Sequence, residues 1–148
     1  MRVEQDFKEF IALLNKNNVQ YLIVGGYAYS YYAEPRFTKD IDFFIATSVE
    51  NAEKIMTALQ EFGFNNVGLN AADFLESGKT IQLGQAPIRI DIITSIDGVL
   101  FDQAWQNRIE GKFGDIPAFF IAKHDLIKNK RAAGRLQDIA DIDKLDKI

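Results

Sequence analysis

Three aspartates stand inside otherwise apolar segments of this 148-residue chain, and they restrict what the chain can fold into. Asp40 and Asp42 open the run Asp40–Ile45, and Asp91 stands in the middle of the apolar run 88–93. Strand interiors disfavour aspartate, and a buried carboxylate is costly unless it is paired or binds a metal ion. A divalent cation shared by the three side chains is the simplest explanation, and it requires the two segments to lie side by side.

The spacing of Asp40 and Asp42 suits such a cation. Side chains two positions apart in a strand point to the same face, with their Cα atoms roughly 6.6 Å apart. Mg²⁺ favours oxygen ligands and usually takes one or two carboxylates together with substrate phosphates. Two metal ions about 3.5–4 Å apart can hold the attacking and leaving oxygens of an in-line displacement. Asp91 completes this site if its strand lies beside the strand of Asp40 and Asp42.

A Gly-Gly pair supplies a second element of the site. Gly25 and Gly26 follow the short apolar run 21–24 and precede a helical pattern. A strand, a tight turn and a helix N-terminus leave backbone N–H groups free for phosphate oxygens, and glycine allows close approach. The Lys-Ser/Thr of a P-loop and the G-x-G-x-x-G spacing are both missing here. The pattern therefore favours neither a P-loop ATPase nor a Rossmann dinucleotide site.

The rest of the chain alternates between helical and strand patterns. A Thr47-x-x-Glu50 capping box begins one helix, and Gly63 and Gly134 end two of them. The patterns predict helices at 5–15, 27–33, 47–62, 71–76, 99–107, 121–133 and 136–145. They predict strands at 21–24, within 37–47, and at 80–83 and 87–94 with a hairpin around Gly84-Gln85, and weak strand character at 109–117. Helices and strands alternate early and strands cluster later, so we predict an α/β (α+β) fold with a mixed sheet in one domain, 1–148.

Composition excludes several kinds of site. The chain has no cysteine and a single histidine, His124, which rules out thiolate zinc sites and multi-histidine metal sites. The net charge of −4 gives no global affinity for polyanions. Five basic residues nevertheless crowd one short stretch: Lys123, Lys128, Lys130, Arg131 and Arg135. The first residues lack a signal-peptide pattern and no apolar stretch is long enough for a bilayer, so we expect a cytoplasmic protein with no membrane contact.

Together these motifs resemble the nucleotidyltransferase superfamily that includes DNA polymerase beta. The superfamily pattern is an apolar residue, Gly-Gly or Gly-Ser, a spacer of about a dozen residues, then Asp-apolar-Asp/Glu-apolar, followed by a later strand carboxylate, which here is Asp91. The resemblance extends to Arg36-x-Thr38 and to a block running from Lys123 to Asp138 that contains Asn129, Lys130, Gly134 and Arg135. This block is similar to small bacterial nucleotidyltransferases related to abortive-infection toxins and to minimal nucleotidyltransferase antitoxins. The resemblance covers nearly the whole chain.

The resemblance implies a nucleotidyltransferase fold with a mixed sheet, flanking helices and C-terminal helices. It implies transfer of a nucleoside monophosphate from an NTP, such as ATP, to a hydroxyl acceptor with release of pyrophosphate. By this resemblance we expect Asp40, Asp42 and Asp91 to hold Mg²⁺, with Mn²⁺ as an alternative, and Asp91 also to accept or orient the acceptor proton. The implied nucleotide contacts are Gly25, Gly26, Ser30, Arg36, Thr38, Lys123, Lys130 and Arg135.

Other interpretations stay open at this point. One alternative is that the chain is an antitoxin-like protein that acts through a partner protein. Another is that it is a catalytically silent nucleotide-binding module. The basic helix residues are alternatively a solvated surface, and we take Lys128 and Arg131 as such. The acceptor is left open among tRNA, a protein hydroxyl and an aminoglycoside. Because little chain remains for an acceptor-binding domain, we expect a contribution from a partner protein or from a self-dimer.

Overall fold

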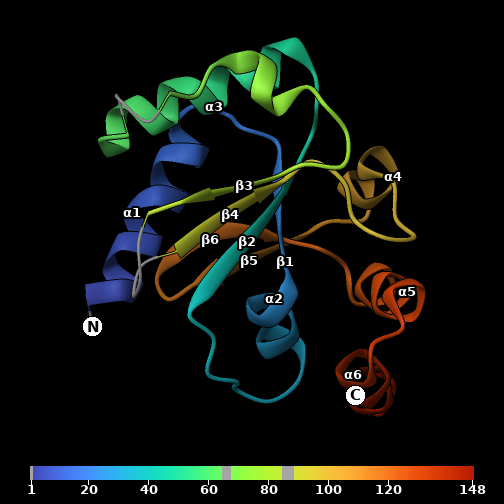
Figure 1. Ribbon diagram of the computed structural model, residues 1–148. Helices are drawn as coiled ribbons and strands as arrows, with labels where there is room; N and C mark the ends of the chain where they lie inside the picture. The colour runs from blue at the N-terminus through green and yellow to red at the C-terminus, as the bar shows by residue number, and fades with distance from the viewer. Residues whose placement is uncertain (1, 65–67, 85–88) are drawn as a thin grey trace.

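A mixed sheet forms the centre of the computed structural model, which describes residues 2–64, 68–84 and 89–148 (Figure 1). In this part of the chain the sheet has six strands in the order β3-β4-β2-β1-β6-β5. The elements are α1 (Arg2–Lys16), β1 (Tyr21–Val24), α2 (Gly25–Tyr32), β2 (Asp40–Ile45), α3 (Val49–Phe62), a 3₁₀ turn η1 (Ala71–Phe74), β3 (Thr80–Leu83), β4 (Arg89–Ile93), α4 (Phe101–Gln106), β5 (Ile109–Phe113), β6 (Ile116–Phe120), α5 (Lys123–Ala133) and α6 (Leu136–Asp146). This is the α/β architecture that the sequence predicts.

Parallel and antiparallel pairs alternate across the sheet. The central pair β1–β2 is antiparallel, and each of its strands has a parallel partner on its outer side, β6 beside β1 and β4 beside β2. The hairpins β3–β4 and β5–β6 add the antiparallel edges. The predicted pairing of the segments 80–83 and 87–94 is confirmed for the described strands, whereas Gln85 and residues 86–88 lie outside the described residues.

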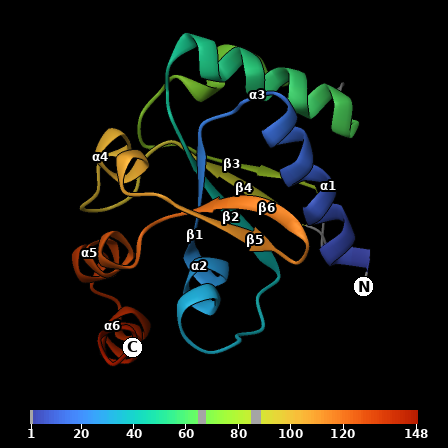
Figure 2. The same cartoon turned by 180° about the vertical axis from the view of Figure 1, so that it is seen from behind.

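Each face of the sheet carries its own hydrophobic core. Figures 1 and 2 show α1 and α3 together on one side of the sheet, with α4, α5 and α6 away from them. The first core joins α1 and α3 to Ile41 and Phe43 of β2, and the second joins α2, α5 and α6 to Phe44. Because side chains alternate along a strand, Asp40 and Asp42 belong to the face of Phe44. The candidate site therefore faces α2, α5 and α6.

Several element boundaries differ from the sequence prediction. Helix α3 is capped by Ser48, whose side chain accepts a hydrogen bond from the Asn51 N–H, so the Thr47 capping box is wrong by one residue. The second strand lies within the segment 37–47 as predicted, whereas the predicted helix 71–76 is a short 3₁₀ turn. The left-handed C-caps at Gly63 and Gly134 are confirmed.

The segment after residue 108 contains two strands where the sequence indicates weak strand character. β5 and β6 form a hairpin around Gly114, and β6 reaches the centre of the sheet, where its Phe120 pairs with Ile23 of β1. Pro117 lies in β6, and a proline argues against a strand in sequence reasoning because it cannot donate to the ladder. None of the helices in the described residues combines the length and the apolar character that crossing a bilayer requires.

Candidate active site

The two strands that carry the aspartates lie side by side, as the three-aspartate hypothesis requires. In the parallel pair β2–β4, Asp42 stands opposite Asp91 and Asp40 stands opposite Arg89. Because this pairing is in register, Asp40 and Asp42 share a sheet face with Asp91, which lies 49 residues after Asp42 in the chain. The backbone pairing of β2 with β4 therefore places the Asp42 and Asp91 side chains next to each other.

The electrostatics of this carboxylate pair are unfavourable for two negative charges. Burial, together with the nearby Asp91 and Asp40 carboxylates, raises the pKa of Asp42 to about 7. Burial also raises the pKa of Asp91. One oxygen of Asp91 and one of Asp40, Oδ1 in each, are buried without a hydrogen-bond partner. Protein groups in the described residues leave these oxygens unsatisfied, which is unusual for buried polar atoms.

Asp40 has a basic side chain next to its carboxylate. Its Oδ1 atom lies 3.6 Å from Nε of Arg89, which is too long for a hydrogen bond but close enough for an ion pair. Within the described residues, no group of three or more His, Cys, Asp or Glu side chains is arranged so that it could hold a metal ion as it stands. The arrangement thus offers the Asp42–Asp91 pair, with Asp40 beside it and partly neutralised by Arg89.

The Gly-Gly pair lies directly against this carboxylate pair. Gly25 has a φ of +67°, and a Cβ atom added to it would clash with the carboxyl group of Asp42. A Cβ on Gly26 would lie 3.2 Å from Oγ1 of Thr38. Helix α2 begins at Gly25, and its N-cap Val24 makes no side-chain hydrogen bond. The first N–H groups of α2 therefore remain available for an anion next to Asp42.

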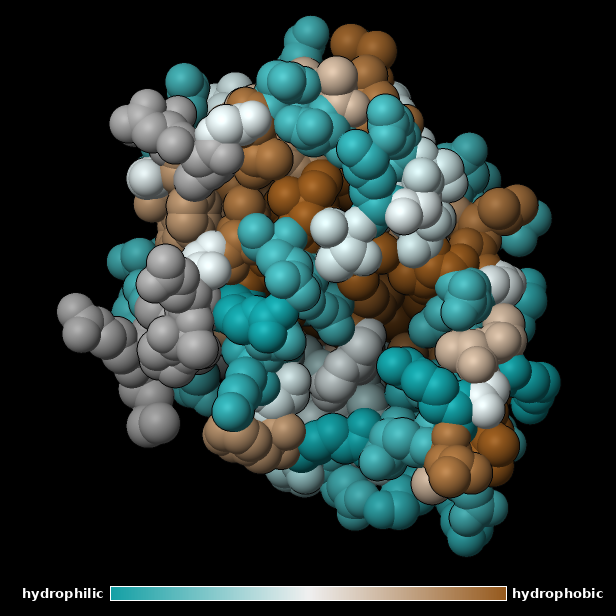
Figure 3. All heavy atoms as spheres, in the orientation of Figure 1, coloured by the Kyte–Doolittle hydropathy of each residue, from teal (hydrophilic) through white to brown (hydrophobic). Residues whose placement is uncertain are grey.

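A cleft of about 480 Å³ opens beside these residues. Of the residues predicted from the sequence, Gly25, Asp42 and Arg135 line it. Asn129 and the segment 95–97 form another part of the wall, where Nδ2 of Asn129 donates to the carbonyl of Asp97 at 2.9 Å. Figure 3, in the orientation of Figure 1, shows hydrophobic side chains in a hollow near the middle of the face in view, with polar side chains around it. Asn129 was not among the predicted contacts, but it lies in the block from Lys123 to Asp138 that resembles the superfamily, and this position is the sequence signal that could have identified it.

The other predicted nucleotide contacts make hydrogen bonds within the protein. Ser30 accepts the Arg36 N–H at 3.1 Å, and Thr38 donates to the carbonyl of Asp40 at 3.1 Å. Lys123 donates to the carbonyl of Ile148 at 2.7 Å. Ser30 and Thr38 therefore organise the loop between α2 and β2, and Lys123 ties α5 to the C-terminal residue.

Arg36, Lys130 and Arg135 are bound to two buried carboxylates that sequence reasoning did not select. Arg36 and Lys130 both contact Asp141, and Arg135 contacts Asp138, which is only 2 % exposed. Asp138 ends the second sequence block, but a helical Asp three positions after an Arg is indistinguishable in sequence from a surface ion pair. The two cases differ in whether the aspartate is buried, and only the folded structure shows that Asp138 is.

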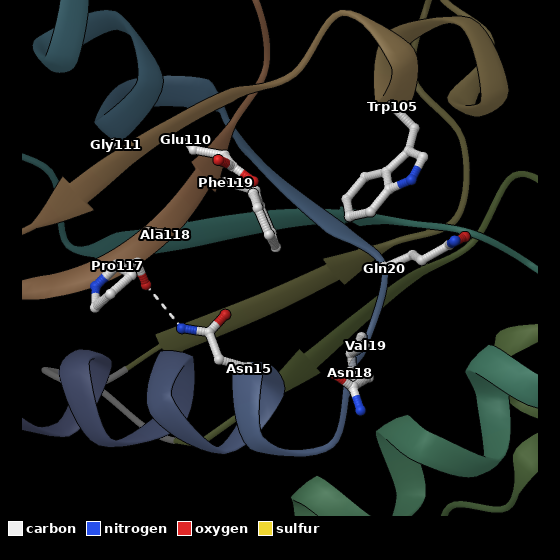
Figure 4. Close-up of a pocket in the computed structure, with 10 residues that line it drawn as sticks. All are labelled: Asn15, Asn18, Val19, Gln20, Trp105, Glu110, Gly111, Pro117, Ala118 and Phe119. Atoms are coloured by element: carbon white, nitrogen blue, oxygen red, sulfur yellow. Dashed lines mark hydrogen bonds between the residues drawn. The ribbon is translucent and has the colours of Figure 1, made fainter.

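A larger cavity lies elsewhere and shares no residue with the carboxylate site. It has a volume of about 550 Å³ and is formed by the end of α1, residues 18–20 just before β1, the β5–β6 hairpin and Trp105 of α4 (Figure 4). Figure 4 shows the Asn15 side chain donating to the carbonyl of Pro117, at 2.7 Å. This hydrogen bond fixes α1 to β6, and the cavity contains no group that the sequence assigns to chemistry.

Comparison with known proteins agrees with this fold and with the predicted superfamily. No curated protein matches the chain. Among solved structures, an antigenic nucleotidyltransferase-like protein from Paracoccidioides brasiliensis is similar, with a TM-score of 0.58, 15% sequence identity and coverage of 97% of this chain and 74% of that chain. At that identity the likeness shows a shared fold. The model of one family, described as "Nucleotidyltransferase of unknown function (DUF6036)", matches residues 1–146, and the chain belongs to that family.

Proposed function

We propose that this protein is a Mg²⁺-dependent nucleotidyltransferase that moves a nucleoside monophosphate from an NTP to a hydroxyl acceptor and releases pyrophosphate. The observation that carries the proposal is the pairing of Asp42 with Asp91 across β2 and β4, directly beside the uncapped N-terminus of α2 at Gly25. Carboxylates for metal and backbone donors for phosphate are the two requirements of this chemistry. The family to which the chain belongs supports the same reaction class.

The carboxylate pair fits a hard divalent cation. Asp42 and Asp91 offer only oxygen donors, and one Asp91 oxygen is buried without a partner. Two carboxylates together with substrate phosphates are a usual ligand set for Mg²⁺, and Mn²⁺ accepts the same donors. Asp40 joins this set if its ion pair with Arg89 opens. When bound, the metal ion neutralises charge on the phosphates and on the attacking oxygen.

The triphosphate is held by backbone groups and one exposed cation in this proposal. The first N–H groups of α2, at Gly25 and Gly26, face phosphate oxygens, and the helix dipole favours the negative charge there. Arg135 lines the same cleft, and its side chain is 78 % exposed although Nε is bound to Asp138. A cleft of about 480 Å³ is within the ordinary range for small-ligand sites.

In this proposal the reaction is a single displacement at the α-phosphorus of the NTP. The acceptor oxygen forms a bond to that phosphorus, the bond to the oxygen bridging to the β-phosphate breaks, and pyrophosphate leaves with the electron pair. Asp91 accepts the proton of the acceptor hydroxyl. Burial raises the pKa of Asp91, which favours proton acceptance over permanent ionisation.

The test is incubation of the protein with each α-labelled NTP and Mg²⁺, with cell extract as the acceptor pool. We expect label to enter one class of acceptor, and we expect EDTA or Asp42→Asn to abolish the transfer. Exposed Asp146 provides the control variant Asp146→Asn, which should retain the transfer. Mg²⁺-dependent nucleotide binding without any transfer would contradict the proposal and favour the silent nucleotide-binding module.

A further inference from the structure

Asp141 of α6 is a buried carboxylate whose bonding capacity is taken up by its neighbours. Its side chain is 1 % exposed. It accepts both terminal nitrogens of Arg36, at 3.0 Å and 2.5 Å, the ammonium of Lys130 at 2.8 Å, and the amide of Gln137 at 2.9 Å. These bonds hold the pKa of Asp141 well below its usual value despite its burial. The carboxylate therefore connects α5, α6 and the loop between α2 and β2.

The Arg36 end of this connection is fixed from two sides. The guanidinium lies over the ring of Tyr29 in α2, with 3.9 Å between Cζ and the ring centroid. The backbone N–H of Arg36 donates to Oγ of Ser30, also in α2. A bidentate pair with a buried carboxylate adds a fixed orientation that a single ion pair would not give.

The loop carries this restraint to the candidate active site. Thr38, two residues after Arg36, donates to the carbonyl of Asp40, and its Oγ1 lies where it would be 3.2 Å from a Cβ atom added to Gly26. Tyr27 of α2 donates to the carbonyl of Thr38 at 3.3 Å. The path from Asp141 through Arg36 and Thr38 thus ends at both components of the site, the phosphate cradle and the first aspartate.

Lys130 is held just as firmly as Arg36. It is 7 % exposed, and Asp141 and Asp138 lie 2.8 Å and 3.6 Å from its Nζ atom. Moving Nζ to a phosphate would remove one cation from two buried carboxylates, Asp141 and Asp138, which is unfavourable. Arg135, in contrast, keeps an exposed side chain at the cleft.

We infer that Asp141 is a positioning residue, and that Arg36 and Lys130 support the nucleotide site through it instead of contacting the phosphates. Asp141 holds the loop 33–39 in place, and the loop sets the positions of Gly26 and Asp40. The nucleotide part of this inference rests on the proposed function. The loop part concerns the protein alone and is testable without a nucleotide.

A double-mutant cycle distinguishes positioning from direct contact, with affinity for Mg²⁺-ATP as the measured quantity. If Arg36 acts through Asp141, Arg36→Gln and Asp141→Asn each weaken binding, and the double variant is no weaker than the worse single variant. If Arg36 contacts phosphate, Arg36→Gln weakens binding while Asp141→Asn leaves it unchanged or tightens it, because the guanidinium is freed. The second pattern would overturn the inference. Lys144→Gln is the matched control, since Lys144 joins α6 to Glu34 of the same loop by an exposed ion pair and should have no effect.

Amide hydrogen exchange tests the loop directly in the protein without nucleotide. The hydrogen-bonded N–H of Arg36 should exchange at least tenfold faster in Asp141→Asn, while the N–H groups of β1 keep their protection. Unchanged exchange at Arg36 would refute the positioning role. If Asp141→Asn does not fold, Arg36→Lys replaces it, because lysine keeps the charge but loses the bidentate fork. Wild-type protein that binds no Mg²⁺-ATP would reject the proposed function, and the exchange result would still decide the positioning role.

Discussion

The carboxyl group of Asp42 fills the space that a side chain on Gly25 would occupy: a Cβ atom there would stand 3.2 Å from Cγ of Asp42 and closer still to one of its oxygens. The glycine is also in the left-handed region, with φ of +67°. The Gly-Gly motif and the Asp-x-Asp motif, 17 residues apart in the sequence from Gly25 to Asp42, are therefore one structural unit. A change in either is expected to displace the other.

This contact predicts a specific cost for Gly25→Ala. Gly78 provides the matched control, because its φ is +80° but nothing lies within 4 Å of an added Cβ. We expect Gly78→Ala to lower the free energy of unfolding by about 1 kcal/mol through backbone strain alone. Gly25→Ala should cost more, since it also displaces Asp42, and it should weaken Mg²⁺-ATP binding. Urea unfolding and calorimetric titration measure the two effects, and equal losses in both variants would show that the Asp42 contact is unimportant.

The raised pKa of Asp42, at about 7, predicts that stability falls as pH rises. The unfolded chain releases this proton near its ordinary pKa of about 3.9, so the folded state binds more protons between these values. The free energy of unfolding should therefore decrease from pH 5 to pH 8 in metal-free buffer. Asp138 and Asp141, whose pKa values are lowered, stay ionised in this window and contribute no slope.

Asp42→Asn should flatten that pH dependence and raise stability at pH 8, while Asp146→Asn at an exposed position should leave the slope unchanged. Urea unfolding at each pH measures both. A wild-type protein whose stability rises between pH 5 and pH 8 would contradict the burial of a proton at the carboxylate pair. Because metal ligands must be deprotonated, Mg²⁺ with ATP should stabilise the wild type more at pH 8 than at pH 5.

Asp91 and Asp42 are expected to differ in their kinetic roles. Asp91→Asn should lower kcat by a factor of about 100 or more, because it removes the proton acceptor of the transition state. It should raise the nucleotide KM less than Asp42→Asn does, because Asp91 is not among the described residues that line the cleft. Asp42→Asn should weaken nucleotide binding as well, since Asp42 lines the cleft. Steady-state kinetics and a Mg²⁺-ATP titration of both variants make the comparison. Near-normal kcat in Asp91→Asn would remove that residue from the reaction.

Sequence patterns predicted the parts of the site that depend on local backbone chemistry. The strand, Gly-Gly turn and helix around Gly25 follow from residue types, and the polar residues in the apolar segments of β2 and β4 indicated that these strands are neighbours. The roles of Arg36 and Lys130 were not predictable in this way. Their partner Asp141 lies 105 residues from Arg36, and only packing of α6 against α2 and α5 buries it. β6 was missed because Pro117 weakens its strand pattern, although tertiary pairing with β1 stabilises it.

Two exposed apolar side chains, Leu136 and Ile139, stand next to the cleft on the side where the acceptor would bind. Leu136 and Ile139 lie on the first turns of α6, immediately after Arg135 at the cleft, and are 88% and 57% exposed. A reaction site open to water weakens the electrostatic stabilisation that this chemistry requires. We propose that another chain, a second copy or a partner protein, covers this apolar surface and supplies acceptor contacts.

Replacing Leu136 and Ile139 together by serine should therefore shift the protein toward monomer or reduce capture of its partner, while Mg²⁺-ATP affinity stays unchanged. Val49→Ser is the matched control, because Val49 is 60% exposed on α3, which packs on the other face of the sheet. Light scattering across a range of concentrations, followed by affinity capture from the native cell, provides the measurement. A wild-type protein that is strictly monomeric, captures no partner and still modifies an acceptor at full rate would show that α5 and α6 alone complete the site.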